Sequence, residues 1–288
     1  VTIPFKGMQE AKVEKERLAR LYLANQETAK FFYDLLMNSP EAEKARNYLS
    51  KRGVTQESIA QFELGFSPAN PEITRRHLMS RGYSEGELLQ SGLLFLADDG
   101  KTFVRFRDLI MFPIRNEKGQ ITGFGARVLD NSLPKYINSP QTPIFDKSSS
   151  IFGIHLSSLA IKQKKLVVIV EGYMDVIIAH QYGFANVVAS MGTAINSKQV
   201  VVLKRLTKNF ALAMDADSAG KHAWLKFAQF ANEEDIDIKL VNLPEGKDPD
   251  DVIKTDARVW EKLVADAPII NKDIDYLLSA GIEGINLS

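Results

Sequence analysis

Five carboxylates in the second half of the chain have residue types and positions that could gather a metal ion. Each stands after an apolar run, and the five are Glu171, Asp215, Asp217, Asp248 and Asp250. Carboxylates held close together repel one another and raise one another's pKa unless a cation compensates. Mg²⁺ prefers oxygen ligands and keeps waters that substrate phosphates can replace. The pattern therefore favours a Mg²⁺-dependent enzyme that works on nucleotides.

Short apolar runs that alternate with helical segments predict the sheet that positions these acids. The expected strands cover residues 166–170, 186–190, 210–214 and 236–243. Helices are expected from Ser197 and over residues 218–234. This alternation is typical of a parallel α/β sheet with right-handed crossover connections. Ligands of such sheets bind outside the carboxyl ends of the strands, so we expect the acids to meet at one edge.

Each acidic motif taken alone also has a purely structural explanation. Asp248 before Pro249 fits a helix N-cap followed by proline at the first helical position. Asp217 or Ser218 could cap the next helix, and Asp175 fits an acid of a first helical turn, which the helix dipole favours. These alternatives stay open for the single motifs. These alternatives do not explain why several carboxylates converge without basic residues beside them. The combination of the motifs therefore favours a metal site.

The first half of the chain changes from a helical to a strand-like period near residue 93. Apolar spacing, N-cap residues and glycines predict helices within residues 13–35, 39–53, 71–82 and 84–92. Residues 93–129 contain alternating segments separated by turn sequences, which predict an antiparallel meander. Residues 133–150 are polar and proline-rich and predict a linker.

Composition excludes several classes of protein and site. The chain has 288 residues, no cysteine, and equal numbers of basic and acidic residues, 36 of each. Disulfides and thiolate metal sites are therefore excluded, and any basic groove must come from local arrangement rather than net charge. The absence of cysteine fits a reducing cytoplasm, where the protein is expected to lie. No apolar run reaches membrane-span length, and no signal-peptide pattern opens the chain. The initial Val1 predicts a fragment or a processed product.

Several motifs together resemble one known family. Three of them resemble the Toprim domain and cover residues 170–176, 213–220 and 246–251. Upstream, Arg-Phe-Arg-Asp, Met-Phe-Pro-Ile, Gly-Phe-Gly-Ala-Arg and Pro-Lys-Tyr-Ile-Asn-Ser-Pro begin at residues 105, 111, 123 and 134. In combination, over residues 4–255, the sequence is similar to the RNA-polymerase core of the bacterial DnaG-type primases.

The resemblance implies an activity and a set of site residues. The activity is DNA-templated synthesis of short RNA primers from NTPs on single-stranded DNA during replication, by nucleotidyl transfer with two or more Mg²⁺ or Mn²⁺ ions. The implied catalytic acids are Glu171, Asp215 and Asp217, with Glu171 either a metal ligand or a proton acceptor. The implied metal ligands are Glu171, Asp175, Asp215, Asp217, Asp248 and Asp250.

Basic residues upstream are candidates for binding nucleic acid and nucleotides. Arg105 and Arg107 are two residues apart in a segment that also contains Phe103 and Phe106, which predicts that both arginines share one face of a strand. By resemblance, a groove for the template backbone and the incoming NTP is lined by Arg105, Arg107, Arg127, Lys135, Asn138 and Lys147. The alternatives are a solvated strand face for the two arginines and a plain Asx turn for Asn138.

The expected fold class is α/β, with an α+β N-terminal subdomain ahead of the Toprim sheet. We expect a mixed helix and antiparallel-strand subdomain with a basic groove over residues 1–150, a metal-binding Toprim subdomain over 151–255, and a short helical segment over 256–288. The family's cysteine-dependent zinc module and its helicase-binding domain are missing from the sequence. The expected partners are single-stranded DNA, NTPs, the RNA primer and a nucleotide alarmone as inhibitor. The replicative helicase is expected to bind only through a missing domain, and no membrane partner is expected.

Two other functions remain alternatives at this point. A Toprim nuclease or topoisomerase would use the same acids to cleave phosphodiesters, but a topoisomerase needs an additional tyrosine-bearing domain. A catalytically weak module that binds nucleotides or single-stranded DNA is the other alternative. The presence of all the family's acidic positions argues against the second of these.

Overall fold

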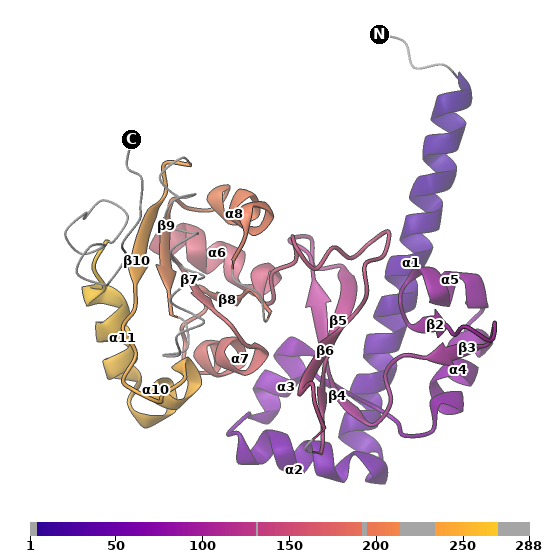
Figure 1. Cartoon of the computed structure of the whole chain (residues 1–288), viewed down its shortest axis with the longest axis horizontal. Helices are drawn as coiled ribbons and strands as arrows, with labels where there is room; N and C mark the ends of the chain where they lie inside the picture. Colours follow the sequence, from indigo (N-terminus) through magenta and orange to yellow (C-terminus); the bar gives the residue numbers. More distant parts are fainter. Residues whose placement is uncertain (1–4, 131, 192–194, 214–233, 270–288) are drawn as a thin grey trace. The chain divides into compact units, whose positions relative to one another are not determined.

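The structure is a computed structural model that describes residues 5–130, 132–191, 195–213 and 234–269. The chain divides into two compact units, Val1–Lys147 and Ser148–Ser288 (Figure 1). Among the described residues, no helix is long and apolar enough to cross a membrane.

Helices form the beginning of the first unit. They are α1 (Phe5–Asn38), the 3-10 helix η1 (Pro40–Ala42), α2 (Glu43–Lys51), α3 (Gln56–Phe62), α4 (Pro71–Ser80) and α5 (Glu85–Gln90). The expected start at Ser39 is confirmed, because its side chain accepts a hydrogen bond from the Glu41 amide ahead of η1. The capping box expected at Ser84 is also present, with Glu87 as its partner.

The first unit contains a four-stranded antiparallel sheet and a separate hairpin. The order of the sheet is β1 (Gly65–Ser67), β4 (Leu109–Arg115), β5 (Ile121–Val128) and β6 (Tyr136–Asn138). The hairpin pairs β2 (Leu94–Leu96) with β3 (Thr102–Val104). The expected antiparallel pairing is confirmed for β2 with β3 and for β4 with β5, but these pairs lie in separate sheets rather than in one meander. The expectation that residues 133–150 form only a linker is wrong. Proline and polar residues around a three-residue edge strand, β6, conceal the strand in the sequence.

Aromatic packing joins the helix α1 to this sheet. The buried rings of Phe32 on α1 and Phe124 on β5 meet edge to face, with their centroids 6.3 Å apart. A Cβ atom on Gly65 of β1 would lie only 2.6 Å from the Cβ of Phe32, so only glycine allows this close approach. Nearby, the buried Asn25 side chain donates a hydrogen bond to the Thr122 carbonyl at 2.9 Å. The core therefore fixes the strands that carry the basic residues discussed below.

The second unit contains a parallel sheet, as the sequence predicts. Its order is β10 (Asp237–Leu240), β9 (Asn209–Leu212), β7 (Val167–Val170) and β8 (Val187–Ala189), and all paired strands are parallel. The described helices of this unit are α6 (Ile154–Lys164), α7 (Tyr173–Gln181), α8 (Ser197–Lys204), α10 (Pro249–Thr255) and α11 (Ala257–Asp266). The helix expected over 218–234 lies almost wholly outside the described residues, and the expected helical tail is described only to α11 and Ile269.

Candidate active site

Glu171 occupies the predicted place at the carboxyl end of a parallel strand. It directly follows β7 and is partly exposed. Beside it, the amide of Ala213, just after β9, donates a hydrogen bond to the Ile169 carbonyl at 2.9 Å. The predicted acids Asp215 and Asp217 lie outside the described residues. β7 and β9 therefore end at the same edge of the sheet.

Asp175 links two of the predicted acidic motifs. It stands in the first turn of α7 and is 8% exposed. Its Oδ2 accepts a hydrogen bond from the Gly172 amide at 3.1 Å, and its Oδ1 accepts one from the Asp250 amide at 3.3 Å. A Cβ atom on Gly172 would lie 2.8 Å from Asp175 Oδ2, so glycine is needed for this arrangement. Asp175 therefore ties the segment after β7 to the beginning of α10.

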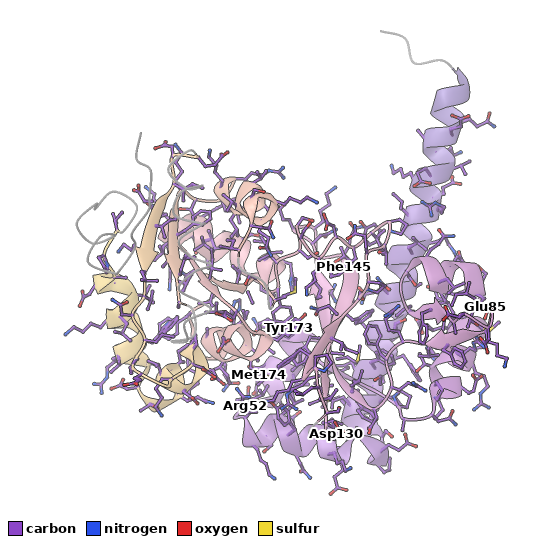
Figure 2. The ribbon with its side chains drawn as sticks, viewed as in Figure 1. Arg52, Glu85, Asp130, Phe145, Tyr173 and Met174 are labelled. Carbon is purple, nitrogen blue, oxygen red and sulfur yellow. The ribbon has the colours of Figure 1, made fainter. Side chains whose placement is uncertain are left out.

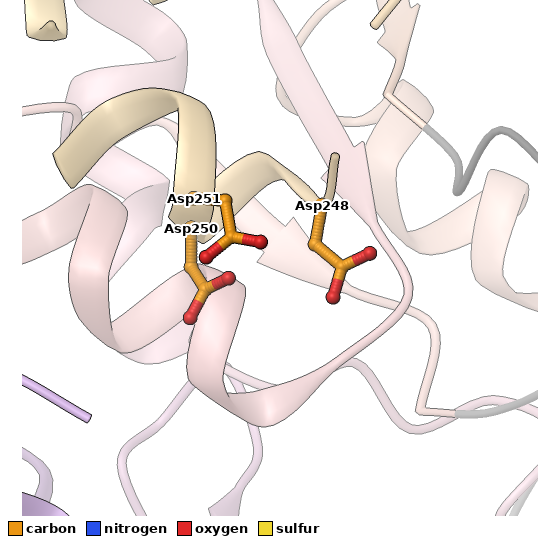
Figure 3. A group of neighbouring side chains, drawn as sticks. All are labelled: Asp248, Asp250 and Asp251. Atoms are coloured by element: carbon orange, nitrogen blue, oxygen red, sulfur yellow. The ribbon is translucent and has the colours of Figure 1, made fainter. Parts of the chain in front are cut away.

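The acidic cluster comprises Asp248, Asp250 and Asp251 at the beginning of α10 (Figure 3). Each offers a carboxylate oxygen, and these three atoms lie within 4.8 Å of one another. Asp248 has the backbone position of an N-cap, but its side chain makes no capping hydrogen bond. Helix capping by its carboxylate therefore does not explain this residue. A hard cation with oxygen ligands fits such a donor set.

Sequence reasoning did not include Asp251 among the candidate ligands. The signal was available, because three acids fall within the four residues 248–251. Asp248 and Asp251 are three residues apart, a spacing that places two side chains on the same side of a helix.

A lysine also lies beside the acidic cluster. Lys254 Nζ is 3.1 Å from Oδ2 of Asp250, whose side chain is 1% exposed, and 3.6 Å from Oδ1 of Asp251. The expectation that the acids lack a basic neighbour is therefore wrong for this motif. The reason is helical geometry, because residues three and four apart on α10 share a face.

Arg127 on β5 lies among tyrosine rings. Its guanidinium carbon is 3.9 Å from the centroid of the Tyr48 ring and 5.8 Å from that of Tyr136. Its Nη1 donates to the Val128 carbonyl at 2.7 Å, whereas its buried Nε has no hydrogen-bond partner in the described part of the chain. Burial, followed by the nearby Tyr48, raises the pKa of Tyr136 to about 12. The arginine is therefore held by two cation–π contacts together with its hydrogen bond to the Val128 carbonyl.

Strand pairing brings three of the predicted binding residues to one region. Arg127 is paired with Tyr136, and Asn138 on β6 is paired with Gly125. The exposed Lys135 precedes β6, and its carbonyl accepts a hydrogen bond from the Val128 amide at 3.1 Å. Arg127, Lys135 and Asn138 therefore lie together at the β5–β6 edge. Lys147 is partly exposed in a turn at the end of the first unit.

Tyr48 and Arg52 were not predicted from the sequence. Nη1 of Arg52, at the end of α2, donates a hydrogen bond to the Tyr48 hydroxyl at 3.1 Å (Arg52 is labelled in Figure 2). We call Tyr48, Arg52, Arg127 and Tyr136 the arginine–tyrosine cluster. The only sequence signal is that Tyr48 and Arg52 are one helical turn apart, which does not reveal their contact with β5.

The prediction that Arg105 and Arg107 share a strand face is wrong. β3 ends at Val104, and Arg105 follows in a bend where its amide donates to the Leu93 carbonyl at 3.0 Å. The Arg105 guanidinium lies 5.4 Å from the ring centroid of Phe95 on β2, and burial lowers its pKa. Arg107 is exposed in the following loop. Arg105 thus contacts the β2–β3 hairpin, whereas Arg127 contacts α2 and β6.

Comparison with known proteins places both units in one family. The model of the DNA primase catalytic core, N-terminal domain, matches residues 31–158, and the Toprim-like model matches residues 168–253. The DNA primase of Clostridium acetobutylicum is 38% identical over 276 residues, which cover 95% of this chain and 45% of the relative. The Escherichia coli DNA primase is 34% identical over 260 residues, 89% of this chain and 45% of the relative. The chain thus spans about half the length of these curated relatives.

Solved structures give the same result over nearly whole chains. The RNA polymerase domain of Mycobacterium tuberculosis primase DnaG superposes with a TM-score of 0.83 at 32% identity, covering 92% of this chain and 88% of that one. A DnaG primase catalytic domain bound to single-stranded DNA superposes with a TM-score of 0.81 at 33% identity, covering 92% and 86%. With its two units, its acidic cluster and these matches, the chain belongs to the family of DnaG-type DNA primase catalytic cores.

Proposed function

We propose that this chain is a primase core that synthesises short RNA primers from NTPs on single-stranded DNA during replication in the cytoplasm. The observation that carries the proposal is the link through Asp175, which joins the segment after β7 to the acidic cluster in a Toprim-like unit. The family supports the reaction class, because the relatives are DNA primases. Residues 1–150 would provide nucleic-acid contacts, residues 151–255 the acids, and residues 256–288 a helical extension.

The acidic residues suit a divalent cation, since family members of the Toprim type use one and three carboxylates of the chain converge. We assign Mg²⁺ or Mn²⁺, with two or more ions, to Glu171, Asp175, Asp215, Asp217, Asp248 and Asp250, and add Asp251 from its position. Bound ions of this kind compensate charge on the transferred phosphoryl group and the leaving pyrophosphate. Asp175 would hold the two segments together. Glu171 would either coordinate an ion or accept the proton of the primer 3′-hydroxyl.

The basic residues suit phosphate groups of template and NTP. Arg127, Lys135 and Asn138 form the proposed binding edge at β5–β6, and Arg52 joins them through Tyr48. Arg105, Arg107 and Lys147 are proposed as further backbone contacts. Phosphate contacts of this kind tolerate any sequence and weaken as salt concentration rises. A nucleotide alarmone would compete with NTPs for these residues, and we assign helicase binding to a part of the longer relatives that this chain does not span.

Primer synthesis by the purified chain tests the proposal. With a single-stranded template, NTPs and Mg²⁺ or Mn²⁺, we expect short oligoribonucleotides, and Glu171→Gln should lower their yield by roughly a hundredfold or more. Glu261→Gln, which changes an exposed acid on α11, is the matched control and should retain activity. No product with either metal, or equal product from Glu171→Gln, contradicts the proposal. Metal-dependent nicking of supercoiled DNA in place of synthesis would indicate a nuclease.

A further inference from the structure

We infer that Tyr48 is a positioning residue for the DNA template, because one side chain holds two arginines in different ways. Its ring face contacts the Arg127 guanidinium at 3.9 Å, and its hydroxyl accepts a hydrogen bond from Arg52 at 3.1 Å. The inference rests on the proposed function, since it concerns how this chain binds single-stranded DNA. It assigns Tyr48 no direct contact with the reacting atoms.

Arg127 keeps its positive charge available in this cluster. Within the described residues, no carboxylate forms an ion pair with Arg127, and its hydrogen bond to the Val128 carbonyl leaves its positive charge uncompensated. A tyrosine ring attracts the cation through its negative face without neutralising it. Tyr48 therefore fixes the guanidinium in place and leaves its charge available to a phosphate.

Arg20, in the same unit, also contacts a tyrosine ring but is neutralised by an acid. Arg20 also lies over a tyrosine ring, 4.8 Å from the centroid of Tyr83. Its Nε, however, donates to Oε1 of Glu87 at 2.7 Å, so an acid neutralises it. Each arginine makes a cation–π contact with a tyrosine, but among the described residues only Arg20 also pairs with a carboxylate. That difference is what a site for an anionic ligand requires.

The Tyr48 hydroxyl positions the second arginine of the cluster, Arg52. Arg52 is the C-cap of α2 and lies one turn beyond Tyr48, so the hydrogen bond limits the directions its long side chain can take. The same tyrosine thereby relates Arg52 on α2 to Arg127 on β5. Ordering both side chains before the ligand arrives reduces the entropy lost when the ligand binds. We expect the two arginines to contact neighbouring phosphates of one strand.

Binding of a fluorescently labelled oligodeoxythymidylate by the full chain, followed by anisotropy, tests the inference. Tyr48→Leu removes ring and hydroxyl and should weaken binding roughly fivefold to tenfold, the range of a partly desolvated cation–π contact. Tyr48→Phe keeps the ring and should recover most of the affinity, with a loss of roughly twofold. Titrations over a salt series should show a shallower slope for Tyr48→Leu, because fewer phosphates are neutralised.

A double-mutant cycle separates positioning from general loss of structure. In an Arg127→Met background, Tyr48→Leu should weaken binding only about twofold further, because the contact with Arg127 is already absent and only the hydrogen bond with Arg52 is lost. Tyr83→Leu, which removes the ring beneath Arg20, is the matched control and should leave affinity and salt slope unchanged. Thermal unfolding of each variant confirms that it is folded at the temperature of the titration.

The outcomes distinguish this inference from the proposed function. If the unmodified chain shows no salt-dependent binding of the oligonucleotide, the proposed function is contradicted and the inference falls with it. If the chain binds and Arg127→Met weakens binding, but Tyr48→Leu does not, the inference alone is wrong. Equal effects of Tyr48→Leu with and without Arg127 would also overturn it, since Tyr48 would then act independently of that arginine.

Discussion

The arginine–tyrosine cluster and the acidic cluster are held in place by different kinds of contact. In the first unit, tyrosines hold the cationic Arg127, and no described carboxylate forms an ion pair with it. In the second, the acidic cluster is held by backbone and lysine contacts, because the amide of Asp250 is bound to Asp175 and the carboxylate of Asp250 to Lys254. Aromatic rings can therefore position a positive charge that stays available, whereas neighbouring carboxylates require cationic groups even before a metal ion binds.

This difference follows from what each charge loses on leaving water. A guanidinium is weakly hydrated and can rest on a ring at modest cost. A carboxylate that is 1% exposed, as in Asp250, needs hydrogen bonds and a counter-charge. We therefore expect substitutions in the acidic region to affect folding and metal binding together. Substitutions in the arginine–tyrosine cluster should affect mainly ligand binding.

The largest effect should come from the residue that ties the acidic motifs together. Asp175→Asn leaves one carbonyl oxygen for two amide donors, those of Gly172 and Asp250, and places an NH₂ group against the other. We expect primer synthesis to fall roughly a hundredfold and the free energy of unfolding to fall by about 1–3 kcal/mol. Denaturant unfolding and the primer assay measure the two effects. Asp266→Asn on α11, an exposed acid, is the control; unchanged stability in Asp175→Asn would show that the α7–α10 link is not required.

A smaller effect, of the opposite sign on metal binding, is expected from Lys254. Lys254→Met removes the cation that lies 3.1 Å from Asp250 and 3.6 Å from Asp251, so Mn²⁺ should bind several-fold more tightly. Without metal, the variant should be less stable by about 1–3 kcal/mol, because the buried carboxylate loses the cation beside it. Calorimetric titration with Mn²⁺ and thermal unfolding with and without metal measure both effects.

The exposed Lys262→Met on α11 serves as the comparison for Lys254→Met. If Lys254→Met weakens Mn²⁺ binding, the lysine supports the acidic cluster rather than competing with the cation for it. In that case both charged regions would be held by neighbours that support ligand binding, and the contrast between them would be weaker.

The parts of the second unit that were predictable from the sequence depend on local structure. The parallel sheet and the place of Glu171 were predictable because apolar runs end in acids, and strand ends share an edge by geometry. The acidic cluster was largely predictable too, since its members are adjacent in the sequence. Residues that are close in sequence come together through local structure alone.

The arginine–tyrosine cluster could not be predicted in this way. Tyr48 on α2 and Arg127 on β5 are far apart in the sequence, so their contact depends on tertiary packing and no local pattern records it. Alternation at residues 103–107 was misleading for a related reason. β3 stops at Val104 because its partner β2 has only three residues, so Arg105 and Arg107 leave the strand.

The smallest effect should separate a neutralised arginine from one that keeps its charge. Hydrogen bonds from Arg20 and then from the Ser84 amide lower the pKa of Glu87 from 4.5 to about 2. Because the pKa is lower in the folded chain, this stabilisation is present above about pH 4.5 and is lost as the pH falls through about 2. Glu87→Gln should therefore cost about 1 kcal/mol at pH 7, and the difference should vanish near pH 2. Arg127→Met, which removes no ion pair among the described residues, should show no such pH dependence in denaturant unfolding between pH 2 and about 5. A parallel pH dependence in both variants would mean that Arg127 has an acid partner.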